Sequence, residues 1–301
     1  MPYFEDYTPY VAELQSGHYS TALDHGLELL MRTKQFAPSQ YWATPKGTPF
    51  YFLGIAALLS HDYQTGMFLI DAAAAEDLRN NPGQNDLPAL LFMQLNVKKP
   101  AQFAFQIVQA TENQLREAVA SYNGRTGCSA ITVNDVRQRF FARVLNAGQP
   151  HRTTLIASFI SYLLEWDYKS ALIGLTEPNV GSREPFFLHL FRGCLLFESL
   201  LKDNPSKTPP ADAALGRLLQ HLSKELGIRP DLSIQSEHYS TIIRSLAPKQ
   251  SIVDAIQCTG TVRNTLAHNI AIQSSLDETN YDLLADNIAS SCLHAISRLY
   301  P

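Results

Sequence analysis

The sequence has few cysteines, and they are far apart. The four are Cys128, Cys194, Cys258 and Cys292, and none lies within four residues of another. This spacing excludes both a zinc knuckle and a Cys-x-x-Cys redox pair. Cys194 and Cys292 stand among apolar residues, where a cysteine usually behaves as a small buried hydrophobe. A reducing compartment is therefore the simplest interpretation.

The sequence also lacks a long apolar run and a large excess of one charge. The longest apolar run, residues 50–59, is too short to cross a bilayer and contains Gly54. The N-terminal residues are acidic and aromatic, unlike those of a secretory signal. A net charge of -4 argues against a broad basic surface for coating nucleic acid, but it does not exclude a local phosphate site. These features predict a soluble, cytoplasmic protein without a membrane segment.

Familiar cofactor and metal motifs are absent as well. The chain contains no glycine-rich phosphate loop, no Gly-x-Ser-x-Gly elbow and no His-Glu-x-x-His. Several histidines lack ligand partners at the spacing of metal sites, namely His18, His25, His61, His151 and His221. We therefore expect neither a cofactor nor a metal.

Apolar residues at helical spacing dominate the sequence, and no stretch shows the alternation of apolar and polar residues that is typical of strands. Thr132 and Asp135 form a candidate capping box for a helix over 132–146, and a second clear helix spans about 277–300. Their apolar stripes are Val136, Phe140 and Val144 in the first, and Leu284, Ile288, Cys292 and Ile296 in the second. The sequence predicts an all-α fold.

A weak repeat predicts stacked helical hairpins in the N-terminal half. Its copies begin at His18, Asp62 and Asp167, and each is expected to follow one helix and open the next. In each copy a tyrosine follows, and an alanine or glycine three positions after it allows close helix packing. The turn resembles that of tetratricopeptide repeats, although Tyr19 and Tyr63 are 44 residues apart, longer than that family's period of about 34.

Three segments interrupt the helical pattern, at 121–130, 176–185 and 203–212. The second contains two prolines and a glycine and is the best candidate for a domain boundary. We predict a helical-hairpin domain over 1–176 and a bundle of four or five helices over 183–301. The helices expected in the bundle are 185–202, 211–226, 237–246, 251–268 and 277–300.

The segment 261–269 carries the most informative pattern. Arg263 is followed directly by Asn264 and, after three further residues, by His268. This pattern resembles the motif of HEPN ribonucleases, and the resemblance covers the C-terminal bundle but not the N-terminal half. It implies a HEPN-like fold, Arg263 and His268 as the catalytic pair, Asn264 in a supporting role, and a homodimer that joins two motifs in one composite site. A second Arg-to-His spacing, Arg183 to His189, lacks the asparagine and contains a proline, so we discount it.

The residue types suit metal-independent cleavage of RNA. Histidine titrates near neutral pH and can take the proton of a ribose 2′-hydroxyl or return one to the leaving oxygen. Arginine stays charged and presents a planar fork to phosphate oxygens. On a regular helix, however, residues five apart point about 140° from each other, so one copy of Arg263 and His268 does not obviously converge on one phosphate.

Two further features have alternative interpretations. Glu198, in the apolar helix 186–201, either orients the catalytic pair from a facing helix or is an exposed helix charge. The second interpretation is favoured because charged residues seldom lie buried without a partner. The arginine row Arg137, Arg139 and Arg143 is either an RNA backbone track or a solvated helix face, and the acidic net charge favours the face.

The sequence therefore predicts an endoribonuclease for single-stranded RNA with a toxin, phage-defence or CRISPR-ancillary role. Its N-terminal helices would bind a protein partner or antitoxin, gate the site or extend the dimer. The alternative is a non-catalytic helical adaptor, because Val262, Leu266 and Ile270 form an apolar face on which this helix can fold without any chemistry. A third hypothesis is a protein that is itself the regulated target of a companion nucleotidyltransferase.

Overall fold

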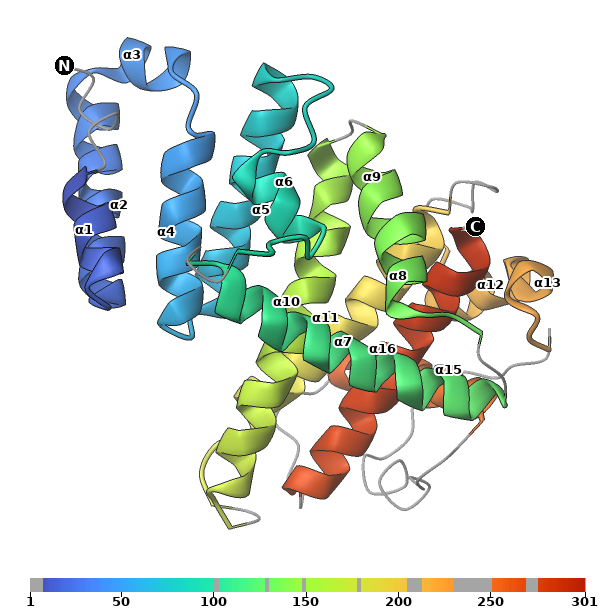
Figure 1. The fold of residues 1–301 in the computed structure, drawn as a ribbon. Coiled ribbons are helices and arrows are strands. Elements are labelled where there is room, and N and C mark those ends of the chain that lie inside the picture. The colour runs from blue at the N-terminus through green and yellow to red at the C-terminus, as the bar shows by residue number, and fades with distance from the viewer. Residues whose placement is uncertain are drawn as a thin grey trace. The chain divides into compact units, whose positions relative to one another are not determined.

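The computed structural model consists of helices joined by turns, which confirms the all-α prediction (Figure 1). It describes residues 8–99, 103–127, 130–147, 150–177, 180–204, 213–229, 251–268 and 276–300, and these ranges contain no strand. The predicted helix 237–246, together with Cys128 and Ile270, lies outside the described residues. Within the described ranges, no helix has both the length and the hydropathy of a membrane span.

The chain forms two compact units that interleave along the sequence. The first comprises residues 1–112 and 141–161, and the second comprises 113–140 and 162–301. Their boundaries fall inside α7 (Phe105–Thr126), the π-helical segment η1 (Arg137–Ala142) and α10 (Pro150–Gly174). The division expected from the sequence, 1–176 and 183–301, cuts the chain once and differs from this arrangement, because a cut placed at a loop cannot divide a continuous helix.

The first unit begins with two helical hairpins. Its helices up to residue 93 are α1 (Thr8–Gln15), α2 (Tyr19–Phe36), α3 (Pro38–Ala43), α4 (Gly47–Leu59), α5 (Tyr63–Asn80) and α6 (Pro88–Met93). Helix α1 packs on α2, α4 packs on α5, and α2 joins the hairpins by packing on α4 (Figure 1). A short helix, α9 (Arg143–Asn146), also belongs to this unit.

The second hairpin shows why small residues follow the repeated tyrosine. Asp62 caps α5, its carboxylate accepting the backbone N–H of Thr65 at 3.1 Å. A Cβ added at Gly66 would lie 2.6 Å from Leu58 Cγ and 3.0 Å from the Leu58 backbone nitrogen. No such contact is tolerated without movement, so α4 and α5 approach as closely as they do because position 66 is glycine.

The third copy of the repeat does not form a turn, and this part of the prediction was wrong. Asp167 lies inside α10, which continues without interruption to Gly174. The first two copies follow Gly17 and His61, which both have positive φ angles and turn the chain. The residue directly before Asp167 is Trp166, which has no positive φ angle and is buried on the packed face of the same helix.

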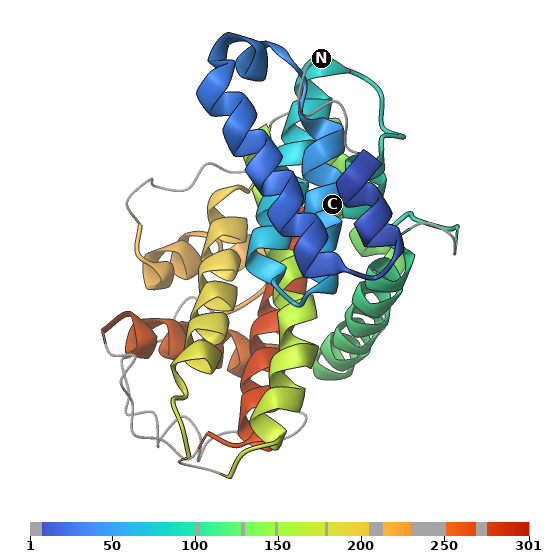
Figure 2. The same cartoon turned by 90° about the vertical axis from the view of Figure 1, so that its left-hand side faces the viewer.

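The second unit is built around three packed helices. Helix α16 (Glu278–Leu299) packs on both α11 (Glu184–Lys202) and α15 (Ile252–His268), and α11 also packs on α15. Two short helices, α12 (Leu215–His221) and α13 (Ser223–Leu226), replace the single helix expected over 211–226. The predictions for 185–202, 251–268 and 277–300 are confirmed to within one residue at each end. Figure 2 shows α11 in yellow and α16 in red.

The predicted capping box is also present. Thr132 Oγ1 accepts the N–H of Asp135 at 3.1 Å, while Asp135 Oδ2 accepts the N–H of Thr132 at 2.8 Å. The helix that follows, α8 (Val133–Val136), runs on into η1, and the expected stripe residues Val136, Phe140 and Val144 are buried. The expected break at 121–130 begins later than predicted, because α7 continues to Thr126.

Candidate functional site

Helix α15 carries the Arg-Asn-x3-His segment at its C-terminal end. At its start, Ser251 Oγ accepts the N–H of Asp254 at 3.2 Å, and Asp254 Oδ2 accepts the N–H of Ser251 at 3.0 Å. This reciprocal pair satisfies backbone donors that have no partner within the helix. The buried face of α15 includes Val262 and Leu266, and the helix ends at His268.

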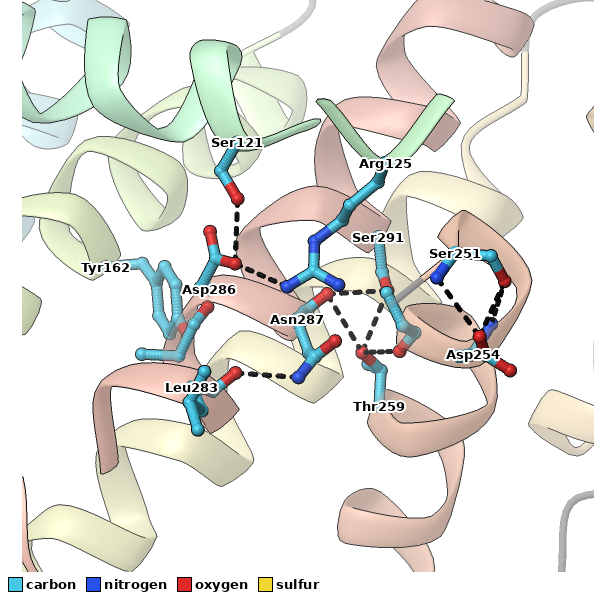
Figure 3. Close-up of polar contacts among 12 residues, drawn as sticks. Ser121, Arg125, Tyr162, Ser251, Asp254, Thr259, Leu283, Asp286, Asn287 and Ser291 are labelled. Atoms are coloured by element: carbon cyan, nitrogen blue, oxygen red, sulfur yellow. Dashed lines mark hydrogen bonds and ion pairs between the residues drawn. The ribbon is translucent and has the colours of Figure 1, made fainter. Parts of the chain in front are cut away.

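Polar contacts on α16 fix its neighbours (Figure 3). Ser121 and Arg125 of α7 point toward Asp286 of α16; Ser121 Oγ donates to Asp286 Oδ2 at 2.8 Å, and Arg125 Nη2 donates to the same oxygen. On α15, the hydroxyl of Thr259 lies 2.8 Å from that of Ser291. Buried polar groups are costly unless they are paired, so these contacts favour one register of α15 against α16.

Arg263 is held by a carboxylate from α11. Its Nε donates to Glu198 Oε2 at 3.0 Å, and its side chain remains 26% exposed. The second carboxylate oxygen of Glu198 accepts Lys202 Nζ at 2.6 Å. Two cations therefore share one carboxylate, which leaves a formal excess of one positive charge (+1 +1 −1) at the surface. Among the described residues, Arg263 Nη2 has no hydrogen-bond partner, so it can bind an anion.

The structure overturns the favoured interpretation of Glu198 as an exposed charge. The residue is only 6% exposed. Burial is possible because Arg263 and Lys202 supply the partners that an ionised carboxylate requires in a low-dielectric environment. A sequence signal for this position existed: Glu198 follows Cys194 by four residues and precedes Leu201 by three, so it falls on the buried face of α11.

Asn264 and His268 stand in different relations to Arg263. Asn264 Oδ1 lies 3.5 Å from Arg263 Nη1, at the outer limit of a hydrogen bond. His268 is exposed at the helix end, and its imidazole makes no hydrogen bond to another of the described residues. Because α15 is a continuous helix, His268 projects about 140° away from Arg263. One copy thus brings Arg263, Asn264 and Glu198 together but not His268.

Three described cysteines of the second unit, Cys194, Cys258 and Cys292, lie in surroundings that disfavour the thiolate. Cys194 and Cys292 are buried and free, as the sequence predicted, and Cys258 is free as well. Burial raises the pKa of the Cys258 thiol to about 12, and it raises the pKa of Cys194 well above its usual value although the nearby Arg263 charge opposes this shift. Because the thiolate is the reactive form, these groups serve as packing residues at neutral pH.

The second Arg-to-His spacing lies in the protein interior. Arg183 is buried and donates to Thr176 Oγ1 at 2.8 Å and to the Glu177 carbonyl at 2.7 Å. His189 is 1% exposed, and burial lowers its pKa to about 3. Neither side chain can reach a substrate, which agrees with the sequence-based decision not to treat Arg183 and His189 as a catalytic pair.

One arginine of the row Arg137, Arg139 and Arg143 forms an ion pair on its own helix. Arg139 Nη2 lies 3.2 Å from Asp135 Oδ1.

Among the described residues, no group of three histidine, cysteine or acidic side chains is arranged to hold a metal ion.

No protein-family model, curated protein or solved structure matches the chain.

Proposed function

We propose that the protein is a metal-independent endoribonuclease of HEPN type that cleaves single-stranded RNA. One observation carries the proposal. The guanidinium of Arg263 is fixed by the buried Glu198 and still reaches solvent, and the exposed His268 ends the same helix. Fixed charge at a solvent-accessible position is what stabilisation of a developing anion requires.

The two side chains have complementary chemical roles. The imidazole of His268 takes the proton of the ribose 2′-hydroxyl or delivers one to the departing 5′-oxygen. The attacking 2′-oxygen forms a bond to phosphorus while the bond to the 5′-oxygen breaks, so the products carry a 2′,3′-cyclic phosphate and a 5′-hydroxyl. Arg263 binds the non-bridging oxygens, on which negative charge develops. Asn264, whose Oδ1 lies 3.5 Å from Arg263 Nη1, helps to orient the guanidinium.

The divergence of Arg263 and His268 on α15 supports a site built by two copies. In a twofold dimer, the same surface of each copy meets its equivalent, so Arg263 of one copy can face His268 of the other. We further propose that the N-terminal hairpins bind a regulatory partner or antitoxin in a toxin or phage-defence role. Their exposed Phe36, Trp42 and Phe68 are the kind of side chains that partner surfaces use.

The test is cleavage of labelled single-stranded RNA by the purified protein in EDTA. We expect cleavage by the wild type and a loss of at least about 100-fold in Arg263→Ala and in His268→Ala. Arg217→Ala and His18→Ala are matched controls, because both residues are exposed and lie outside the site. An inactive wild type, or full activity in either site variant, contradicts the proposal.

A non-catalytic adaptor is the second candidate, and the Arg263–Glu198 ion pair is the observation that favours it. An arginine whose Nε binds a buried carboxylate also serves to lock α11 against α15 without any substrate. In that case, Arg263→Ala would lower stability without changing a catalytic rate, and the wild type would not cleave RNA.

A further inference from the structure

Two pairs of cations border helix α11, and each pair shares one buried carboxylate. Arg263 and Lys202 share Glu198, as described above. At the other pair, Glu165 Oε1 accepts Arg192 Nη1 at 2.8 Å, and Lys169 Nζ lies 3.9 Å from Oε2. The Glu165 side chain is 4% exposed, whereas that of Arg192 is 39% exposed. In each cluster two cations share one carboxylate and one cation faces solvent: the Arg192 side chain is 39% exposed and that of Lys202 is 40% exposed.

The two clusters are joined by one exposed face of α11. We call this face the α11 stripe; its members are Leu188, Arg192, Leu195, Ser199 and Lys202. At 100° per residue these five positions fall within about 80° of the helix circumference. They are exposed or half-buried, while their neighbours along α11 are mostly buried. Arg192 and Lys202 are ten residues apart, or about 15 Å along the axis.

We propose that the α11 stripe binds the backbone of single-stranded RNA next to Arg263, with Arg192 and Lys202 contacting separate phosphates. This inference rests on the proposed ribonuclease function and names the path of its substrate. Leu195 is 40% exposed and lies between the two cations, where it offers an apolar surface to a base or ribose. Single-strand binding sites combine a positively charged track with side chains that contact the bases. The stripe has the cations, and Leu195 supplies an aliphatic rather than an aromatic contact.

Charge decides between RNA and a second copy of the chain as the occupant. Pairing two stripes would bring the exposed cations Arg192 and Lys202 of one copy against those of the other. A polyanion neutralises both clusters at once and releases its own counterions. The buried Glu165 and Glu198 are already engaged, so they hold the cations in place rather than compete with an incoming phosphate.

The experiment measures binding of a labelled, uncleavable 2′-O-methyl oligouridine by fluorescence anisotropy as a function of salt. Leu195→Lys adds a cation to the stripe and keeps both buried carboxylates, Glu165 and Glu198, in the chain. Each phosphate contact on a single strand contributes about 0.7 to the slope of log affinity against log salt. We expect Leu195→Lys to steepen the slope by about that amount. Leu175→Lys is the matched control, because Leu175 is 81% exposed and off the stripe.

Loss variants complete the test. Lys202→Met and Arg192→Gln should each reduce the slope by about 0.7, Arg192→Lys should restore it, and Lys224→Met should leave it unchanged. If the salt slope is the same in Leu195→Lys, Lys202→Met and the wild type while the wild type cleaves RNA, the stripe does not bind RNA. The ribonuclease proposal is then unaffected. If RNA binding depends on the stripe residues but the wild type does not cleave RNA, the stripe proposal is supported and the ribonuclease proposal is rejected. If Leu195→Lys weakens self-association instead and leaves RNA binding unchanged, the stripe is an interface between copies and the proposal is overturned.

Discussion

Two buried histidines make the stability of the second unit depend on pH. His189 stacks on Tyr162 with ring centroids 4.5 Å apart, and its Nε2 lies 3.0 Å from the Tyr162 carbonyl oxygen. A carbonyl only accepts, so Nε2 carries the proton and Nδ1 accepts from the Tyr281 hydroxyl at 2.8 Å. The folded protein therefore holds a neutral imidazole at this position.

His294 of α16 repeats the arrangement. Its Nε2 donates to the Leu226 carbonyl at 2.7 Å, and its Nδ1 accepts from the Tyr122 hydroxyl at 3.1 Å. Burial is the main cause that lowers the pKa of His189 to about 3 and that of His294 to about 4, from a usual value of 6.5. Hydrogen bonds to the backbone carbonyls oppose the shift but do not cancel it.

The sign and size of the effect follow from proton linkage. Between about pH 4 and 6.5 both imidazoles are neutral in the folded chain and protonated in the unfolded chain, so the unfolded state binds more protons. Stability is fully present above pH 6.5 and falls as the pH is lowered toward 4. Each histidine contributes a slope of about 1.4 kcal/mol per pH unit in this window. Lowering the pH from 7 to 5 should thus remove about 2 kcal/mol for each histidine.

The assay is urea unfolding at several pH values, followed by the fluorescence of Trp166. The chain has two tryptophans, and Trp42→Phe leaves Trp166, a residue of the second unit, as the only reporter. His294→Gln keeps an amide donor near the Leu226 carbonyl but cannot titrate. We expect this variant to lose about 1.4 kcal/mol per pH unit of the slope.

The control and the refuting result are both defined by that slope. His18→Gln is the control substitution, because His18 is exposed and belongs to the first unit. Asp77 of the first unit has a pKa raised to about 6 by burial and by Glu76, and its linkage has the opposite sign. The contribution of His294 is therefore the difference between the slopes of the variant and the wild type, in which the Asp77 contribution cancels. If His294→Gln and wild type have equal slopes, His294 is not held neutral in the folded protein.

Three other changes test separate parts of the account. Glu198→Gln removes the charge that fixes Arg263; we expect about 1–2 kcal/mol lower stability in urea unfolding and a lower kcat with little change in KM for RNA. Gly66→Ala places a methyl group against Leu58 and should destabilise the α4–α5 hairpin by about 1–3 kcal/mol, measured by hydrogen exchange of α5 amides. Thr132→Ala removes the capping hydroxyl of α8 and should cost about 1 kcal/mol in thermal unfolding, whereas an unchanged Tm would show that the capping box does not stabilise this helix.

Features set by local chemistry could be predicted from the sequence. Asp277 accepts the backbone N–H of Asn280 at 2.8 Å and so starts α16 where the sequence placed its beginning. The Thr132 capping box and the buried stripes of two helices were predictable for the same reason. A cap or a helical period acts within one or two turns and needs no knowledge of the rest of the chain.

Features set by tertiary contacts could not be predicted. Asp167 has the local pattern of a turn, but the buried contacts of Trp166 keep α10 continuous. Glu198 was expected to be exposed because its partner Arg263 is 65 residues away in the sequence. The Arg-Asn-x3-His segment was recognisable by itself, and Glu198 was one candidate for orienting it. Only the packing of α11 on α15 decided between that role and an exposed charge.

The central claim is that Arg263 of one copy and His268 of another act on the same phosphodiester. Mixing Arg263→Ala with His268→Ala, each inactive alone, tests it most directly, because a mixed dimer restores one complete pair. Random exchange makes half of the dimers mixed with one of two sites intact, so we predict about a quarter of wild-type cleavage. If native mass spectrometry confirms mixed dimers and the mixture stays inactive while the wild type cleaves, the shared site is contradicted.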